Sequence, residues 1–561
     1  MVFSHTLFTL SVPLLTTIGY VVYCGYQNRC KINKLRKQGI PMPKWNWVTG
    51  HLLVLQKYVD RLPADAFVQL AMQDLALEYK DTEIFLMDFW PIYPPFFIVF
   101  DPDAAVQIST KHVLPKLDLH LAMMKPIVGG PNLHSMSGQE WKEWRAVFNP
   151  GFSNSSMMDL MPAVVDSVEV FCDILREKAG SGILRLDDLT TSLTMEIILK
   201  VTLDMDSGHQ RSQHKLAHAL HVITAWHSFW DPRILLNPLR PFFQNYYSRV
   251  VENCIKDELH QRFTEIQQEK KSPQSSQSGP NRAKSVIALA LEAYLADSTL
   301  KKGSDSTDEL DEHFAKYASY QIRLFLFAGN DTTSSTIVYT YYMLSKHPDV
   351  LTQMRQEHDR VFGYDLSTTG LLLKSKPALL NQCPYTLAVI KETLRLFAPA
   401  STARGGGKGL TLTDRHGNVY PLDDIGANIL HPSVHYNPRI WPRAEEFLPE
   451  RWLVDPDHEL YPNPAAWRPF EQGPRNCIGQ TLVYNEMRTV LVMTAREFDI
   501  SPAYDEWDAM NLQNQSSIAK LSRWVGLTKE TPKTVHGERA YQTEKAGTHP
   551  ADGYPCRVTL H

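Results

Sequence analysis

The chain begins with an apolar pattern: residues 6–26, TLFTLSVPLLTTIGYVVYCGY, contain no charged residue. A helix of about 20 residues, each rising about 1.5 Å, spans the hydrocarbon layer of a bilayer, so this run predicts one membrane helix. No Lys or Arg precedes the run, and five follow it, at Arg29, Lys31, Lys34, Arg36 and Lys37. By the positive-inside rule, the chain after the helix then lies in the cytosol and the N-terminus in the lumen.

A cleaved signal peptide is the alternative interpretation of the same run. It requires a basic start, a shorter apolar segment and a small-residue cleavage site, and none of these is clear in this sequence. We therefore expect an uncleaved, single-pass membrane anchor at residues 1–28. We expect residues 29–45 to be a basic, Pro-rich hinge, because the prolines of GIPMP at 39–43 cannot continue a helix.

The pattern of the remaining chain predicts a mainly helical domain with a minor sheet. Residues 83–100, EIFLMDFWPIYPPFFIVF, are rich in aromatic and β-branched residues, which predicts a small sheet with a turn near Pro94 and Pro95. Residues 310–346 predict one helix long enough to cross the whole domain. Residues 271–282 are polar and rich in Pro, Gly and Ser, so we expect a surface loop there rather than a domain boundary.

Composition and charge are those of a globular protein. The 561 residues are 43% hydrophobic and 21% charged, and 57 basic against 61 acidic residues give a net charge of −4. Nucleic-acid-binding proteins usually have a basic excess, so we expect no nucleic-acid partner. The seven cysteines are dispersed without a C-x-x-C pair, which indicates reduced thiols rather than disulfides or a zinc site. We expect one catalytic domain at residues 46–527, followed by a polar, irregular C-terminal extension at 528–561.

Small and polar residues interrupt the middle of the long predicted helix, at Ala328, Gly329, Asn330, Asp331, Thr332 and Thr333. Glycine within a helix costs about 1 kcal/mol relative to alanine, and Ser, Thr or Asp compete for backbone hydrogen bonds. Such a segment can make room for a flat ligand, with the hydroxyl of Thr332 and the carboxyl of Asp331 serving as a proton path. A helix kink or a notch for close packing explains the same residues equally well.

Charged and aromatic residues on two further predicted helices are candidates for buried contacts. Glu392 and Arg395 in KETLRLFAP share a helix face, and FLPERW offers Arg451 to the same carboxylate. A buried Glu–Arg–Arg set needs mutual pairing to offset desolvation, and unrelated surface charges are the alternative. Trp141 and Arg145 in GQEWKEWR also share a face, where an indole N–H and a guanidinium could hold an anion. An amphipathic surface helix is the alternative there.

One cysteine lies in an unusual bend, in FEQGPRNCIG at residues 470–479. Gly473 permits a tight bend, and the pattern of residues 479–493 predicts a helix starting just after Cys477. Amides at a helix start favour a thiolate, which binds metals at neutral pH. A single cysteine cannot build a four-ligand zinc site but can be one axial ligand of haem, and Arg475 is then placed near a haem propionate. A buried inert cysteine and a cysteine nucleophile are the alternatives.

Five motifs in this chain resemble those of the cytochrome P450 family. They are W-x-x-x-R at 141–145, A-G-x-D-T-T at 328–333, E-x-x-R at 392–395, P-E-R-W at 449–452 and F-x-x-G-x-R-x-C-x-G at 470–479. The cysteine motif is specific, and the others gain weight from their joint order. The resemblance covers residues 35–527. The anchor with its proline hinge resembles the microsomal, reductase-dependent type, and residues 537–558 resemble fungal members that act in secondary metabolism.

The resemblance implies a mainly α fold with a minor β region, the triangular helical prism of this family, and a haem b cofactor. Cys477 would be the axial ligand of the haem iron, with Phe470 near its sulfur. Thr332 would hydrogen-bond iron-bound dioxygen, with Asp331 supplying protons. The implied partners of the haem propionates are Trp141, Arg145, Arg404, His435 and Arg475. The implied structural set, which would lock the chain before the cysteine loop, is Glu392, Arg395 and Arg451.

The resemblance also implies the activity, a haem-thiolate monooxygenase that inserts one oxygen atom of O2 into a lipophilic small molecule such as a fungal polyketide. No dinucleotide fingerprint is present, so we expect electrons from NADPH through a separate NADPH–cytochrome P450 reductase. Both proteins would lie in the endoplasmic reticulum membrane, with the lipid bilayer as a further partner. A haem-thiolate isomerase or dehydratase, and a non-enzymatic haem protein that binds a ligand, stay open as alternatives. The pair Asp331 and Thr332 argues against the non-enzymatic protein.

Overall fold

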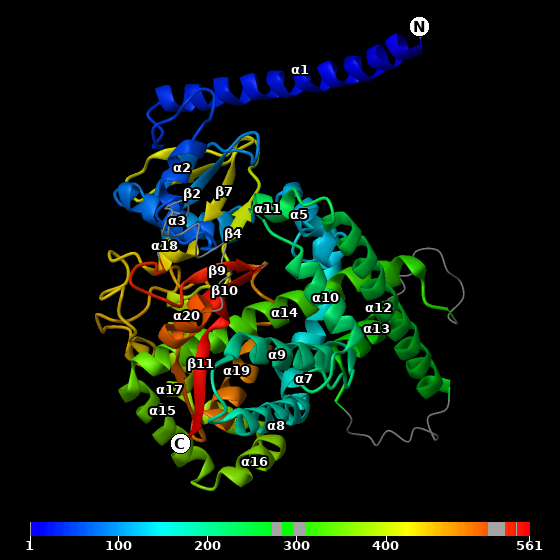
Figure 1. The fold of residues 1–561 in the computed structure, drawn as a ribbon, viewed down its shortest axis with the longest axis vertical. Helices are drawn as coiled ribbons and strands as arrows, with labels where there is room; N and C mark the ends of the chain where they lie inside the picture. The colour runs from blue at the N-terminus through cyan, green and yellow to red at the C-terminus, as the bar shows by residue number, and fades with distance from the viewer. Residues whose placement is uncertain (1, 230, 272–282, 297–308, 514–532, 546) are drawn as a thin grey trace.

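The structure is a computed structural model, and it describes residues 2–229, 231–271, 283–296, 309–513, 533–545 and 547–561. Its body is mainly helical with small sheets, as the sequence predicts (Figure 1). Almost all of the predicted loop at 271–282 lies outside the described residues. The helices α12 (Arg240–Lys271) and α13 (Val286–Ala296) lie on either side of it along the chain.

The described helices fall into two groups along the chain. Those before α12 are α1 (Val2–Lys37), α2 (Leu52–Val59), α3 (Val68–Ala76), α4 (Pro102–Val106), α5 (Asp118–Val128), α6 (Gly138–Phe148), α7 (Asn154–Asp159), α8 (Met161–Lys178), α9 (Leu186–Leu203), α10 (Lys215–Ala225) and α11 (Pro232–Leu235). Those after α13 are α14 (Glu312–Lys346), α15 (Pro348–Phe362), α16 (Thr369–Ser375), α17 (Pro384–Leu396), α18 (His431–His435), α19 (Gln480–Thr494) and α20 (Tyr504–Gln513).

The N-terminal helix α1 lies along one edge of the body and extends beyond it (Figure 1). Its C-terminal part is docked, because Arg29 pairs with Asp88, which also accepts a hydrogen bond from Trp45 Nε1 at 2.9 Å. The helix ends at Lys37, so the predicted hinge starts as helix before its proline segment. Among the described residues, no helix combines the length and the apolar character that crossing a membrane requires. The anchor at residues 1–28 therefore stays a prediction.

A four-stranded sheet brings together strands from distant parts of the chain. Its strands, in order, are β1 (Ile84–Met87), β2 (Phe96–Val99), β7 (Gly426–Ile429) and β4 (Thr402–Arg404). The predicted hairpin is confirmed, because β1 and β2 are antiparallel, fully buried and joined through Pro94 and Pro95. β7 pairs in parallel with β2 and antiparallel with β4, whose last residue is Arg404. A separate hairpin is formed by β5 (Thr411–Thr413) and β6 (Val419–Pro421).

The long helix α14 crosses the centre of the body, which confirms the helix predicted from residues 310–346 (Figure 1). It packs against α5, α9, α12 and α17. The packing against α9 is close at Gly329, where a Cβ would lie 2.9 Å from Ile198 Cδ1. The interpretation of Gly329 as a notch for close packing is therefore confirmed. A larger side chain there would push α9 away from α14.

The C-terminal segment forms strands and packs into the body. β9 (Gln542–Lys545) and β10 (Gly547–Pro550) form an antiparallel hairpin, which lies beside α14. β11 (Pro555–Leu560) pairs antiparallel with β8 (Phe498–Pro502) and β3 (Leu184–Arg185). The prediction of an irregular tail is therefore wrong for residues 542–545, 547–550 and 555–560. All three strands are short, and β11 pairs only with distant segments, so the local apolar pattern carries little signal.

Candidate functional site

The helix α14 and the cysteine loop face one cavity. The centre of a water molecule can occupy about 300 Å³ of this cavity. Its lining includes Ala328, Gly329, Thr332, Thr333 and Thr336 from α14, and Phe470, Cys477 and Gly479 from the loop. The two segments that the sequence singles out are therefore brought together, although they are far apart along the chain. Gly329 serves both the packing against α9 and the cavity wall.

The acid and the alcohol of α14 point to different places. Thr332 lines the cavity, and its Oγ1 donates a hydrogen bond to the Ala328 carbonyl at 2.8 Å. Asp331 does not line the cavity, and its Oδ1 lies 3.0 Å from Nε2 of His549 on β10. Only Thr332 of the predicted pair is thus in reach of a molecule in the cavity. Sequence reasoning missed His549, because nothing in the tail predicts its contact with α14.

The bend before Cys477 is closed by backbone contacts. Gly473 has a φ of 77°, and a Cβ there would lie 2.7 Å from the carbonyl oxygen of Ser109, so only glycine fits. The N–H of Cys477 donates to the carbonyl of Phe470 at 2.9 Å. α19 then begins at Gln480, which confirms the helix predicted just after the cysteine. The loop therefore holds Cys477 in place through its backbone and leaves its thiol for another partner.

Opposing effects act on the pKa of the Cys477 thiol. Burial raises this pKa, and the backbone amides of Gly479 and Gln480 and the charge of Arg145 lower it, with burial the larger effect. The side chain is nevertheless exposed, and what it faces is the cavity. The start of α19 therefore does not ionise the thiol by itself, contrary to the expectation from the sequence. A bound metal cation would supply the missing stabilisation of a thiolate.

Basic side chains gather around the cavity, namely Lys116, His134, Arg145, Arg404 and Arg475. Arg404 is 1% exposed, and within the part of the chain that the structure describes its Nε and Nη1 have no hydrogen-bond partner. Burial lowers the pKa of Arg404, of Lys116 and of Arg475, the last to about 10. Buried cations without partners are costly unless an anion joins them, so this cluster is suited to an anionic ligand. Lys116 and His134 lie outside every motif, and no sequence signal pointed to them.

The cavity fits haem by its chemistry. Cys477 offers a sulfur ligand, and the unpartnered nitrogens of Arg404 are donors for a carboxylate. The guanidinium carbon of Arg475 lies 4.7 Å from the centre of the Trp141 ring. Arg145 donates to the carbonyl oxygen of Asn476 at 3.0 Å, next to the cysteine. Four of the five predicted propionate partners, Trp141, Arg145, Arg404 and Arg475, therefore line the cavity.

His435 is the predicted propionate partner that the structure does not bring to the cavity. It is fully buried, and its Nε2 accepts a hydrogen bond from the N–H of Arg468 at 3.0 Å. His431 lines the cavity instead, with Nε2 3.4 Å from Oε1 of Glu471. The two histidines begin and end the short helix α18. Their four-residue spacing puts both on one helix face, so the sequence could not choose between them.

The predicted Glu–Arg–Arg set is formed and fully buried. Arg395 donates to Glu392 through Nε at 3.0 Å and Nη2 at 2.8 Å, and Arg451 Nε donates to the same carboxylate at 3.0 Å. All three side chains are 0% exposed, so the alternative of unrelated surface charges is excluded. Trp452 Nε1 and the N–H of Leu448 also donate to Glu392, at 3.0 and 3.1 Å. This carboxylate therefore joins α17 to the segment that leads toward the cysteine loop.

Comparison with known proteins agrees with these features. The family model described as Cytochrome P450 matches residues 40–523. The chain is 38% identical to cytochrome P450 monooxygenase polC of Polytolypa hystricis, over 99% of this chain and 96% of that protein. It is 30% identical to cytochrome P450 monooxygenase acrF of Aspergillus aculeatus, over 89% of this chain and 98% of that protein.

A likeness to solved structures extends to the fold. The crystal structure of the cytochrome P450DA heme domain superimposes with a TM-score of 0.67 at 18% identity, over 93% of this chain and 98% of that one. At this identity the likeness shows the fold alone. The family match and the two fungal relatives go further. The chain belongs to the cytochrome P450 family, and it is a monooxygenase that resembles fungal members of that family.

Proposed function

We propose that this monooxygenase inserts one oxygen atom of O2 into a lipophilic small molecule, a fungal secondary metabolite such as a polyketide. The observation that carries the proposal is the shared cavity of the Cys477 thiol and the Thr332 hydroxyl. Apolar side chains, among them Ile198, Phe325 and Pro399, line the same cavity. Burial of apolar surface contributes about 25 cal/mol per Å², so such walls favour a lipophilic substrate. The relatives polC and acrF are both named cytochrome P450 monooxygenases, which supports the insertion of oxygen.

Cys477 is our proposed ligand of the haem iron, and Trp141, Arg145, Arg404 and Arg475 are the proposed partners of the propionates. When bound, a haem with a thiolate ligand supplies the activation of dioxygen. The protein's part is to bind and orient that group. The hydrogen bond from the N–H of Cys477 to the carbonyl of Phe470 supports a fixed sulfur position. The Phe470 ring is itself held 5.2 Å from the ring of Tyr484, centre to centre.

Thr332 and Asp331 are our proposed proton-handling residues. Thr332 lines the cavity, and its hydroxyl donates a hydrogen bond to the Ala328 carbonyl. The same oxygen can also accept a hydrogen bond from a neighbouring group. Asp331 is adjacent on α14, but its carboxylate lies on the side of β10. A proton path would therefore run from the hairpin side of α14 to its cavity side, through these two consecutive residues.

The Arg404→Met variant is expected to retain haem poorly. Arg404 has two unpartnered nitrogens in the cavity wall, and a hydrogen bond to a charged group contributes about 1.5–3 kcal/mol. Haem affinity should therefore fall roughly 10- to 100-fold. The measurement is the haem content per polypeptide after dilution against apomyoglobin, which captures released haem. The exposed Arg415 in the β5–β6 connection offers a control, since Arg415→Met should retain haem as the wild type does. Equal retention by both variants would contradict the role of Arg404.

Electrons are proposed to come from NADPH through a separate NADPH–cytochrome P450 reductase, with both proteins at the endoplasmic reticulum membrane. The basic residues after the apolar N-terminal run support this location. The test combines full-length protein, reductase and NADPH with extracts of a strain that lacks the gene. We expect a compound that accumulates in that strain to gain one oxygen atom, only with NADPH. Turnover without NADPH would favour an isomerase or dehydratase, and binding without turnover would favour a non-enzymatic haem protein.

A further inference from the structure

A histidine from the C-terminal hairpin joins two buried carboxylates. Nδ1 of His549 on β10 lies 2.6 Å from Oδ1 of Asp187, the second residue of α9. Nε2 of the same ring lies 3.0 Å from Oδ1 of Asp331 on α14. The side chains of His549, Asp187 and Asp331 are 6%, 7% and 13% exposed. Three segments that are distant along the chain therefore meet at one imidazole, directly behind the cavity wall that carries Thr332.

The imidazole is a cation at neutral pH. Burial lowers the pKa of His549. The two carboxylates, Asp187 on α9 and Asp331 on α14, together raise it by more than burial lowers it, so that the pKa is about 10. Both ring nitrogens then carry a proton, and each donates to one carboxylate. A charge-assisted hydrogen bond of this kind is shorter and about twice as strong as a neutral one. His549 therefore fixes the position of the Asp331 carboxylate more firmly than a neutral partner would.

The hairpin backbone closes over the same carboxylate. A Cβ at Gly547 would lie 1.6 Å from Oδ2 of Asp331, so any side chain at this position would displace the carboxylate. Oδ2 is itself buried, and none of the described residues forms a hydrogen bond with it. Asp331 is thus held at Oδ1 by His549 and confined at Oδ2 by the glycine. A buried carboxylate oxygen without a partner is costly, which suits a group that handles protons rather than one that only stabilises the fold.

The hairpin is also tied to the cavity wall. Thr548 Oγ1 donates to the carbonyl of Pro399 at 3.3 Å, and Pro399 lines the cavity. Gln542 Nε2 donates to the carbonyl of Ala398 at 3.0 Å. The hairpin that carries His549 is therefore anchored to the wall of the cavity. A shift of the hairpin would move both the wall and the carboxylate.

We propose that His549 is a positioning residue for proton delivery: it holds Asp331 beside Thr332, which makes the C-terminal hairpin part of the catalytic machinery. This inference rests on the proposed role of Asp331 in handling protons. His549 does not line the cavity and acts only through Asp331, so it adds no reactant and no product to the proton transfer. This role explains why His549 lies between the carboxylates of Asp187 and Asp331, an arrangement that no sequence motif predicted.

The test uses full-length, haem-loaded protein with reductase and NADPH, without added substrate, in H2O and in D2O. His549→Gln is expected to slow NADPH oxidation at least about tenfold, because general acid–base transfer contributes about 10²- to 10⁴-fold. The solvent isotope effect should increase, because proton transfer becomes the slow step. In an Asp331→Asn background, His549→Gln should change the rate by less than about twofold, since the two residues act as one unit. A purely structural role would instead add to the loss.

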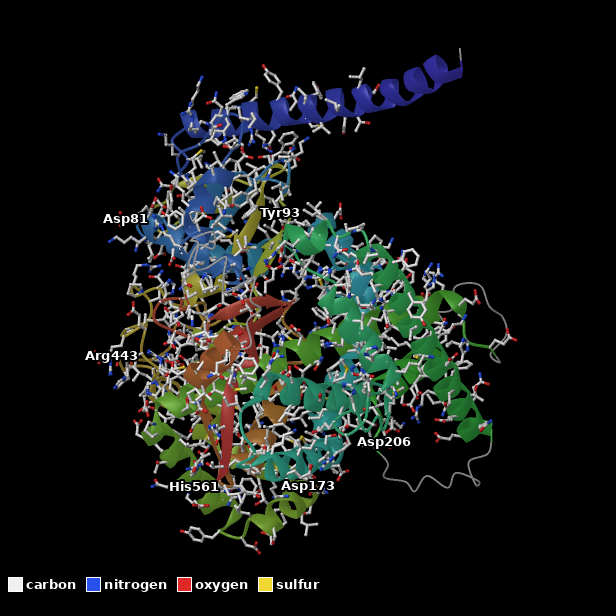
Figure 2. The ribbon with its side chains drawn as sticks, viewed as in Figure 1. Asp81, Tyr93, Asp173, Asp206, Arg443 and His561 are labelled. Carbon is white, nitrogen blue, oxygen red and sulfur yellow. The ribbon has the colours of Figure 1, made fainter. Side chains whose placement is uncertain are left out.

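Two matched variants guard against misfolding of His549→Gln. Gly547→Ala retains all three charges but displaces Asp331, so it should reproduce the slow rate and the larger isotope effect. His561→Gln removes a histidine that pairs with Asp499 at the exposed C-terminal end of β11, and it should behave as the wild type (Figure 2). The reduced CO spectrum of each variant reports whether haem and its sulfur ligand are intact.

A readout that does not depend on turnover is the NMR titration of His549 in protein labelled at histidine. The pKa of His549 should be about 10 in the wild type and should be lower in Asp331→Asn, where only the carboxylate of Asp187 still raises it. The proposal is overturned if the titration gives an ordinary pKa in the wild type. It is also overturned if His549→Gln and Gly547→Ala, with intact CO spectra, oxidise NADPH at the wild-type rate. If the wild type itself had no thiolate spectrum or did not oxidise NADPH, the proposed function would be overturned instead.

Discussion

Glu392→Gln should lower the free energy of unfolding by about 3–5 kcal/mol, the cost of breaking a buried ion pair from one side. The carboxylate of Glu392 accepts hydrogen bonds from Arg395, Arg451, Trp452 and the N–H of Leu448. Without its charge, two guanidinium groups stay buried at 0% exposure with no carboxylate between them. We expect the segment before the cysteine loop to loosen, with loss of haem. Urea unfolding followed by circular dichroism, together with the haem content, measures both effects.

The chain offers a matched control for this carboxylate. Glu446 also pairs with an arginine three residues away, Arg443, but there the two side chains are 51% and 54% exposed at the surface (Figure 2). Exposed pairs of this kind contribute little, so Glu446→Gln should unfold at the same urea concentration as the wild type. If Glu392→Gln matched this control, the buried set would not be what holds the region together.

Cys477→Ser is expected to abolish monooxygenase activity to background while leaving the polypeptide folded. The loop is closed by the backbone of Cys477, whose N–H donates to the Phe470 carbonyl, and a serine can make the same bond. A hydroxyl, however, is a far weaker iron ligand than a thiolate at neutral pH. NADPH-dependent product formation measures the activity, and circular dichroism checks the fold. Cys254→Ser, on α12 and outside the cavity lining, should remain active. Activity in Cys477→Ser would contradict the assignment of the ligand.

Much of the helical fold and the cysteine loop could be predicted from the sequence, because their signals are local. The helix predicted from residues 310–346 matches α14 to within two residues at its start. Pro94 and Pro95 between two β-rich runs predicted the hairpin β1–β2. Gly473 marked the bend before Cys477, where its φ of 77° is indeed required. In each case the residues that form the element also carry the pattern that predicts it.

The parts that sequence reasoning missed depend on contacts between distant segments. β11 lies between β8 and β3, and both partner strands come from segments far from it along the chain. His549 meets Asp187 and Asp331 across 362 and 218 residues of chain, which no local pattern reveals. His431 and His435 share a helix face, so only the packing of α18 decides which of them reaches the cavity.

The ionisation of Cys477 was the least predictable property of the site. The helix start that favours a thiolate is present at Gln480, but burial outweighs its amides in setting the pKa of the free thiol. Both effects act on the sulfur of Cys477. The sequence indicates the helix start, but it does not show how deeply the loop is buried.

The most direct test of this account is the absorption spectrum of the purified, full-length protein, reduced with dithionite and exposed to carbon monoxide. The account predicts a bound haem whose Soret band lies at the position specific for a thiolate ligand, and its loss in Cys477→Ser. A protein without haem, or a Soret band at the position of a nitrogen-ligated haem, would contradict it.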